Sequence, residues 1–142
     1  MKLVGDLLDH KGTDIVSISP GAAVVDAANL MAEKEIGSLI VMQDGKLCGI
    51  VTERDYARKV IVGGRSTEST LVADIMTAEV LTAGLDQSVD ECMTLMTEKR
   101  IRHLPIVEAE RVLGIISIGD LMNAIVTDHY GEIGALDQPG GN

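Results

Sequence analysis

Two short stretches place a hydroxyl three residues before a carboxylate. GIVTERD contains Thr52 and Asp55, and GIISIGD contains Ser117 and Asp120. At a helix start this spacing forms a capping box, in which the hydroxyl and the carboxylate each accept a hydrogen bond from a backbone N–H. The same groups can hold a nucleotide, because free N–H groups at a helix start bind phosphate and a carboxylate accepts two hydrogen bonds from a ribose diol. Spacing alone leaves both interpretations open.

Both stretches belong to an internal repeat, since Gly114 follows Gly49 by 65 residues. Residues that recur unchanged at this offset include, in the first copy, Leu30, Met31, Glu33, Lys34, Ile36, Leu39, Gly49, Ile50 and Asp55. Upstream, VGDLL from Val4 resembles VADIM from Val72. Self-similarity at a fixed offset is the signature of a repeated structural unit. The duplication covers almost the whole chain.

Each copy predicts the order strand, helix, strand, strand, helix. The predicted strands are residues 15–19, 39–42 and 47–51, and then 80–82, 104–107 and 112–116. Apolar residues at i, i+3, i+4 and i+7 predict amphipathic helices from Val24 and from Val89. Asp44-Gly45 is a strong hairpin turn signal, and we expect a longer turn at residues 108–111. Second helices are predicted at about 53–62 and 118–129.

A half of this length buries only about 60% of its unfolded surface. We therefore expect an α/β (α+β) protein whose two halves, each with a small mixed sheet, share a core with pseudo-twofold symmetry and form a related pair of clefts. The expected boundaries are a first repeat at 1–64 with an N-terminal helical segment, a linker at 65–71, a second repeat at 72–130 and a flexible tail at 131–142.

Composition excludes several classes of protein. The formal net charge of −10 argues against binding to nucleic acid or anionic lipid, and the absence of Phe and Trp removes the usual stacking platforms for bases. No run approaches the roughly 18 apolar residues that cross a bilayer, and the N-terminus lacks the apolar centre of a secretory signal. We therefore expect a cytoplasmic protein.

Neither catalysis nor metal binding is indicated. The chain has no Walker loop, G-x-G-x-x-G, H-E-x-x-H or G-x-S-x-G motif, so no nucleophile or base is identified and we expect no enzyme. Cys48 and Cys92 are too few for a disulfide framework and lie among apolar residues, as core residues do. His103 has no ligand-spaced partner in His10 or His129, so no metal site is predicted.

Four features together resemble a pair of cystathionine β-synthase (CBS) domains, a Bateman module. They are the repeated order of elements, the strand IRHLPIV, the two endings that combine Gly-Ile with a hydroxyl and an aspartate, and the DIMT that precedes the second copy. The resemblance covers about residues 4–126. It implies a regulatory protein that binds AMP, ADP, ATP, NAD(H) or S-adenosylmethionine without turnover, requires no cofactor and regulates a partner domain or protein. It also implies a homodimer, because CBS pairs commonly form disk-like dimers.

The resemblance further implies two clefts in which an aspartate contacts ribose and the neighbouring hydroxyl faces ribose or phosphate. The first cleft would comprise Thr52, Arg54, Asp55, Arg58, Ser38, Glu79, Leu81 and Ile101. The second would comprise Ser117, Asp120, Arg102, His103, Asp14, Val16, Ile36 and Gly37. The resemblance implies that several of these positions would contribute main chain to an adenine pocket from the opposite repeat.

The copies differ in their basic residues. Arg102 and His103 match family positions that contact phosphates, whereas the first copy has Gly37 and Ser38 there and Ile40 in place of Pro105. Arg54, with Arg58 one turn later, offers the first copy a substitute, although an exposed arginine on a capped helix is an equal alternative. We expect the clefts to differ in ligand or affinity.

Two other functions stay open from the sequence. One is a dimerisation scaffold with empty clefts, and the other, less favoured, is a nucleotide-metabolising enzyme. The barrel of inosine monophosphate dehydrogenase, an enzyme that carries an inserted CBS pair, is too long for 142 residues. Saturable binding without turnover would distinguish the sensor from both.

Overall fold

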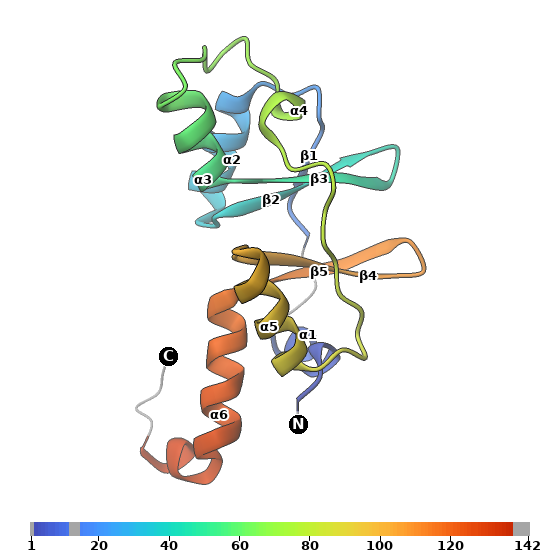
Figure 1. Ribbon diagram of the computed structural model, residues 1–142, viewed down its shortest axis with the longest axis vertical. Helices are drawn as coiled ribbons and strands as arrows, with labels where there is room; N and C mark the ends of the chain where they lie inside the picture. The colour runs from blue at the N-terminus through green and yellow to red at the C-terminus, as the bar shows by residue number, and fades with distance from the viewer. Residues whose placement is uncertain (1, 12–14, 138–142) are drawn as a thin grey trace. The chain divides into compact units, whose positions relative to one another are not determined.

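The computed structural model describes residues 2–11 and 15–137. Its strands form two small sheets, and helices pack on each of them (Figure 1). It divides into two compact units. Unit 1 comprises Met1–Thr13, Thr82–Glu108 and Leu113–Asn142, and unit 2 comprises Asp14–Leu81 and Ala109–Val112. The predicted mixed architecture with two tandem repeats is confirmed. None of the described helices is long and apolar enough to cross a membrane.

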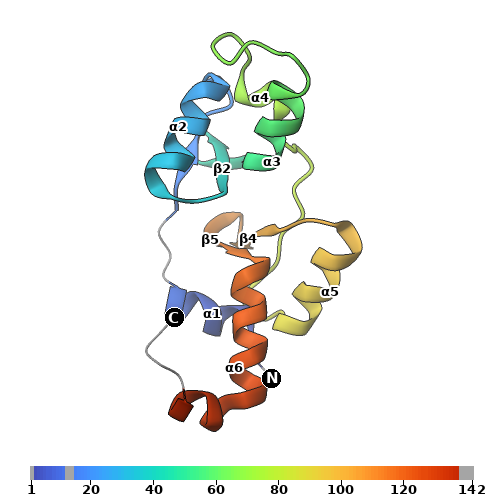
Figure 2. The same ribbon diagram turned by 90° about the vertical axis from the view of Figure 1, so that its left-hand side faces the viewer.

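Unit 2 contains a three-stranded sheet in the order β1 (Ser17–Ile18), β2 (Ser38–Gln43) and β3 (Lys46–Thr52). β1 runs parallel to β2, and β2 runs antiparallel to β3. One face of the sheet carries α2 (Val24–Lys34), α3 (Glu53–Asp55) with the π-helical η1 (Tyr56–Ile61), and α4 (Val72–Ile75) (Figures 1 and 2). The core between them is formed by Val24, Ala27, Met31, Leu39, Val41, Val51, Val60, Val72 and Ile75.

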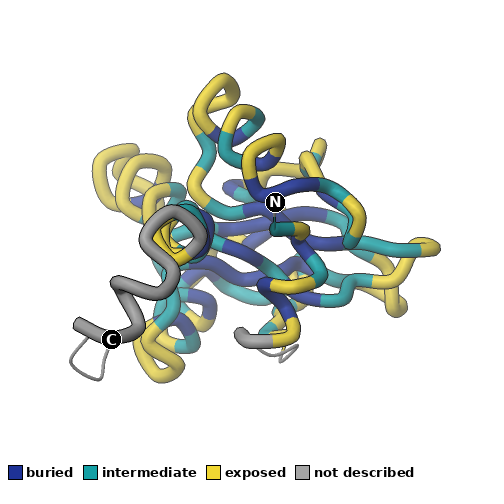
Figure 3. Tube along the Cα trace, turned by 90° about the horizontal axis from the view of Figure 1, so that it is seen from below, coloured by how far each residue is buried: buried dark blue, intermediate teal, exposed yellow. Residues whose placement is uncertain are grey.

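The β2–β3 hairpin has the turn that its sequence predicts. Asp44 and Gly45 both have positive φ, 54° and 77°, which is the mirror-image turn that matches strand twist. A register shift leaves Cys48 unpaired in the ladder, and its Sγ donates to the Val41 carbonyl oxygen at 3.4 Å. Strand centres are buried and hairpin ends are exposed (Figure 3).

Unit 1 contains the hairpin of β4 (His103–Glu108) and β5 (Arg111–Ser117). Its helices α1 (Val4–Lys11), α5 (Val89–Lys99) and α6 (Ile118–Asp137) lie on one face of that hairpin (Figures 1 and 2). The core of the unit is formed by Val4, Leu7, Leu8, Ala83, Val89, Cys92, Met96, Leu104, Ile106, Ile116, Leu121 and Ala124.

The segment before each repeat packs with the other repeat. α1 comes first in the chain, yet Val4 and Leu8 are buried in the core of unit 1, and the Val4 N–H donates to the Gln87 carbonyl oxygen at 2.8 Å. α4 lies just before the second repeat, yet Val72 is buried in unit 2 and donates to the Ala22 carbonyl oxygen at 2.8 Å. Packing therefore does not follow sequence order for these two helices.

The prediction of a strand at residues 80–82 is wrong. Only Ala83 pairs in parallel with β4, where its N–H donates to the Pro105 carbonyl oxygen at 3.0 Å. In the first repeat Ile40 occupies the position of Pro105, and its N–H donates to the Val16 carbonyl oxygen at 3.3 Å. Proline has no N–H, so the equivalent bond cannot form and the strand is not extended.

Two further expectations are corrected. The turn between β4 and β5 consists of Ala109 and Glu110 alone and is no longer than the first turn, with φ of 50° and 66° at these residues. α6 continues to Asp137, past the predicted end at His129, because a glycine such as Gly131 costs a helix only about 1 kcal/mol relative to alanine and does not end it by itself.

Candidate functional site

Thr52 and Asp55 form a complete capping box. Thr52 ends β3 and caps α3, and its Oγ1 accepts from the Asp55 N–H at 3.1 Å. In return, Asp55 Oδ2 accepts from the Thr52 N–H at 3.0 Å and from Thr52 Oγ1 at 3.1 Å. The Asp55 side chain is 14% exposed. The capping interpretation is confirmed for this pair, and the Asp55 side chain is not fully buried.

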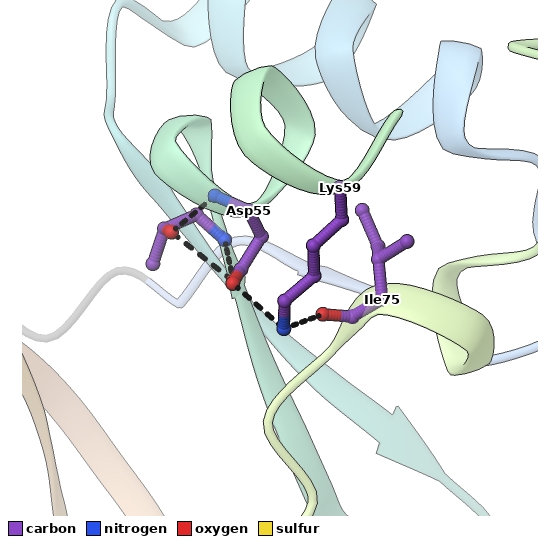
Figure 4. Close-up of polar contacts among 4 residues, drawn as sticks. Asp55, Lys59 and Ile75 are labelled. Atoms are coloured by element: carbon purple, nitrogen blue, oxygen red, sulfur yellow. Dashed lines mark hydrogen bonds and ion pairs between the residues drawn. The ribbon is translucent and has the colours of Figure 1, made fainter. Parts of the chain in front are cut away.

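Lys59 holds the other oxygen of this carboxylate (Figure 4). Its Nζ lies 3.2 Å from Asp55 Oδ1 and donates to the carbonyl oxygen of Ile75, the last residue of α4, at 2.8 Å. Lys59 is not among the residues predicted from the sequence. Its position four residues after Asp55 is a signal for an ion pair, but that spacing is common on helices.

Residues from β2 lie beside the first capping box. Ser38 pairs with Thr52 across the sheet and is only 6% exposed. The preceding residue, Gly37, accepts a hydrogen bond at its carbonyl oxygen from the Glu53 N–H at 3.0 Å. Gly37 was assigned to the second predicted set, yet this bond ties its backbone to the start of α3. Ser38 and Thr52 are thus neighbours, as the first predicted set requires.

Two cations of the first set, Arg54 on α3 and Arg58 on η1, are exposed to solvent. They lie on the same short helical segment as Asp55. Asp55 is paired with Lys59 and the exposed Glu53 offsets one arginine, so residues 53–59 keep one positive charge in excess. The arrangement suits an anion better than a cation.

Ser117 and Asp120 repeat the capping box in unit 1. Ser117 ends β5 and its N–H donates to Asp120 Oδ2 at 2.7 Å, while the Asp120 N–H donates to Ser117 Oγ at 3.1 Å. The Ile118 N–H donates to the Arg102 carbonyl oxygen at 2.9 Å, which is the counterpart of the bond between Glu53 and Gly37. Arg102 is exposed and the neighbouring His103 is half-buried. The structure therefore groups these four predicted residues at one end of unit 1.

The other predicted residues are more scattered. Glu79 and Leu81 are exposed in the irregular segment after α4, whose start is anchored by pairing of Thr77 with Ile50. Val16 and Ile36 are half-buried in unit 2, whereas Ile101 packs against the core of unit 1. Asp14 lies outside the described residues. Each predicted set thus draws on both units, and its membership stays a prediction.

Two groups on α5 have pKa values that depart from their usual range. Hydrogen bonds from the Ser88 backbone and side chain lower the pKa of Glu91, and burial raises the pKa of the Cys92 thiol. Both residues lie outside the two predicted sets. Within the described residues, no group of three or more His, Cys, Asp or Glu side chains is placed to hold a metal ion.

Comparison with known proteins supplies relatives for both repeats. A family model described as "CBS domain" matches residues 4–62 and 72–127. The mitochondrial CBS domain-containing protein CBSX3 of Arabidopsis thaliana is 44% identical over 119 residues, which cover 80% of this chain and 58% of that protein. This chain therefore spans less than two thirds of that relative.

Two solved structures share the fold. A protein with CBS domains from Burkholderia ambifaria is 46% identical with a TM-score of 0.86, and the match covers 89% of this chain and 96% of that one. The CBS domain pair of protein MJ0100, solved in complex with 5′-methylthioadenosine and S-adenosyl-L-methionine, is 26% identical with a TM-score of 0.79. That match covers 90% of this chain and 98% of the other.

An enzyme also matches, but only over a small part of its length. The inosine-5′-monophosphate dehydrogenase of Thermoplasma acidophilum is 34% identical over 110 residues, which cover 77% of this chain and 21% of the enzyme. The similarity is limited to the CBS part of that larger protein.

Proposed function

The chain belongs to the CBS domain family, and from this premise we propose that it is a regulatory protein that binds an adenosine nucleotide, AMP, ADP, ATP or NAD(H), without turning it over. The observation that carries the proposal is the repeated capping box, in which Asp55 and Asp120 are held by backbone and hydroxyl groups at a helix start. The adenosine compounds bound by the CBS pair of protein MJ0100 support this class of ligand.

In this proposal the aspartate accepts hydrogen bonds from the ribose diol. Thr52 already occupies Asp55 Oδ2 with two donors, so the diol would approach mainly from the Oδ1 side. A carboxylate accepts several bonds, and each bond to a charged group contributes about 1.5 to 3 kcal/mol. Preorganisation by the cap lowers the cost of ordering the side chain on binding.

Phosphate groups of the ligand would meet the basic residues near each box. We assign this role to Arg102 and His103 in unit 1, and Arg54 with Arg58 would supply a different arrangement in unit 2. Arginine favours phosphate because its planar guanidinium donates two parallel hydrogen bonds. The two sites are therefore proposed to differ in affinity or in preferred nucleotide.

We further propose a homodimer whose equilibrium between two conformations responds to the nucleotide. The second helix of each repeat exposes an apolar side chain, Ile61 at 59% in unit 2 and Val126 at 54% in unit 1, so each unit has apolar surface that a second copy would cover. A ligand can shift such an equilibrium only by its difference in affinity for the two conformations. A regulated partner protein would read the shift.

A thermal-shift panel tests the proposal. The wild type is measured with AMP, ADP, ATP, NAD, NADH and S-adenosylmethionine, together with the variants Asp55→Asn and Asp120→Asn. A ligand at 100 times its Kd adds about 2.7 kcal/mol of stability, which raises the Tm by several degrees in a protein of this size. Absence of a shift with every compound contradicts the proposal, and a shift accompanied by hydrolysis of the nucleotide contradicts its regulatory character.

A further inference from the structure

Lys59 joins two segments of unit 2 through one amine. Its Nζ lies 3.2 Å from Asp55 Oδ1 and donates to the Ile75 carbonyl oxygen at 2.8 Å (Figure 4). An ammonium group has three N–H donors, and these two partners are the ones it has among the described residues. The Lys59 side chain is 47% exposed, and its amine has one N–H more than these two partners use.

The second repeat cannot make this arrangement. Ala124 stands at the position equivalent to Lys59, and it is buried in the apolar core of unit 1. The charged neighbour of Asp55 at this position is therefore replaced by an apolar residue in the second repeat. With Arg54 and Arg58 also exposed on this segment, the Asp55 site presents a net positive charge to a ligand.

We propose that Lys59 is a specificity-determining residue of the Asp55 site, which makes it select phosphorylated adenosine compounds over uncharged ones. This inference rests on the proposed function and extends it to one site. Lys59 cancels the repulsion between Asp55 and a phosphate, and its third N–H donates to a phosphate oxygen. The contact with Ile75 fixes the amine, so that it can act without leaving the carboxylate.

The experiment isolates the Asp55 site by placing every variant in an Asp120→Asn background. Titration calorimetry then measures the Kd of ATP and of adenosine, which share ribose and base and differ in charge. Lys59→Met removes the amine and keeps the length of the side chain. Lys46→Met, at the exposed start of β3, removes the same charge away from Asp55 and is the matched control.

Lys59→Met is expected to weaken ATP binding and to leave adenosine binding unchanged or stronger. The ratio of the two Kd values should change by about tenfold or more, which corresponds to at least about 1.4 kcal/mol. Lys59→Arg, which keeps the charge, should retain most of the preference, and Lys46→Met should not alter it. Circular dichroism confirms that each variant is folded.

Three results overturn the inference. Equal weakening of ATP and adenosine shows that Lys59 only positions Asp55, and unchanged affinities in Lys59→Met show that it has no role. If Asp55→Asn abolishes binding in either case, the proposed function survives and only the role of Lys59 fails. If the wild type binds neither ATP nor adenosine, the inference fails, whereas the proposed function fails only if AMP, ADP and NAD(H) do not bind either.

Discussion

Gly49 lies so close to Met76 that a Cβ on Gly49 would stand 2.6 Å from the Met76 Sδ and 2.9 Å from the carbonyl oxygen of Thr77. Thr77 also exchanges two backbone hydrogen bonds with Ile50, at 3.0 and 2.9 Å. The first residue of GIVTERD therefore permits the chain after α4 to pack directly on β3. This contact fixes the start of the segment that carries Glu79.

Gly49→Ala is expected to destabilise the protein by about 1 to 3 kcal/mol, because the added methyl group overlaps backbone as well as a side chain. Gly114→Ala is the matched control in the second repeat, where the nearest atom is the flexible end of Leu8 at 3.0 Å. Urea unfolding measures both. Equal losses of stability in the two variants would contradict this account of Gly49.

The turn of Ala109 and Glu110 predicts a stabilising change. Both residues have positive φ without being glycine, which costs about 1 to 2 kcal/mol per residue. Replacing the pair with Asn-Gly should raise the free energy of unfolding by about 1 kcal/mol, whereas Asp44→Asn in the first turn should change it little. A urea midpoint that does not rise in the Asn-Gly variant would show that this turn is not strained.

The cap of α5 predicts a dependence on pH. Ser88 Oγ accepts from the Glu91 N–H at 3.0 Å, and the hydrogen bonds from Ser88 lower the pKa of Glu91 below its usual 4.5. A lowered folded-state pKa contributes stability above pH 4.5 that disappears as the pH falls through the folded-state value. Ser88→Ala removes the hydroxyl that accepts from the Glu91 N–H but keeps the backbone N–H that donates to Glu91 Oε1, so it should destabilise the protein and leave most of the pH dependence in place.

The control for the pH dependence is the neighbouring carboxylate on α5. Glu91→Gln should remove the acid-sensitive part of the stability, and Asp90→Asn should leave it, because Asp90 is not the capping-box residue. Thermal unfolding from pH 3 to 7 measures all three variants. An acid-sensitive loss of stability that persists unchanged in Glu91→Gln would show that Glu91 does not contribute.

The two cysteines should differ in reactivity. Cys92 is 0% exposed and burial raises the pKa of its thiol, so little thiolate is present at neutral pH. Cys48 is half-buried at the bulge of β3. Iodoacetamide should modify Cys48 much faster than Cys92 in the native protein, and mass spectrometry of digests measures the two rates. Comparable rates would contradict the packing of α5.

The repeat and the apolar periodicity were sufficient to predict the tandem architecture and nearly every helix and strand. The secondary-structure predictions were wrong where one or two residues override the repeat and the apolar periodicity. Pro105 removes the donor that the second copy of the first strand needs, and Ala109 with Glu110 forms a tight turn without any turn-forming residue type. The packing of α1 with the second repeat depends on contacts between residues distant in sequence, which periodicity does not report.

The candidate site was also predictable from the sequence only in part. The capping boxes at Thr52 and Ser117 follow from local spacing and are confirmed. Lys59 could not be singled out, because its contact with Ile75 joins segments 16 residues apart. The ligand role of either aspartate stays a prediction, since a cap and a ribose acceptor use the same atoms.

The central claim is tested most directly by titration calorimetry of the double variant Asp55→Asn/Asp120→Asn with the nucleotide that stabilises the wild type. The control is Asp74→Asn, because Asp74 Oδ2 accepts from the Leu71 N–H at 2.9 Å and caps α4 outside the two predicted sets. Each lost bond to a charged group is worth about 1.5 to 3 kcal/mol, so the double variant should bind more than about tenfold more weakly while Asp74→Asn binds as the wild type does. Equal affinity of the double variant and the wild type would contradict the claim that these aspartates hold the ligand.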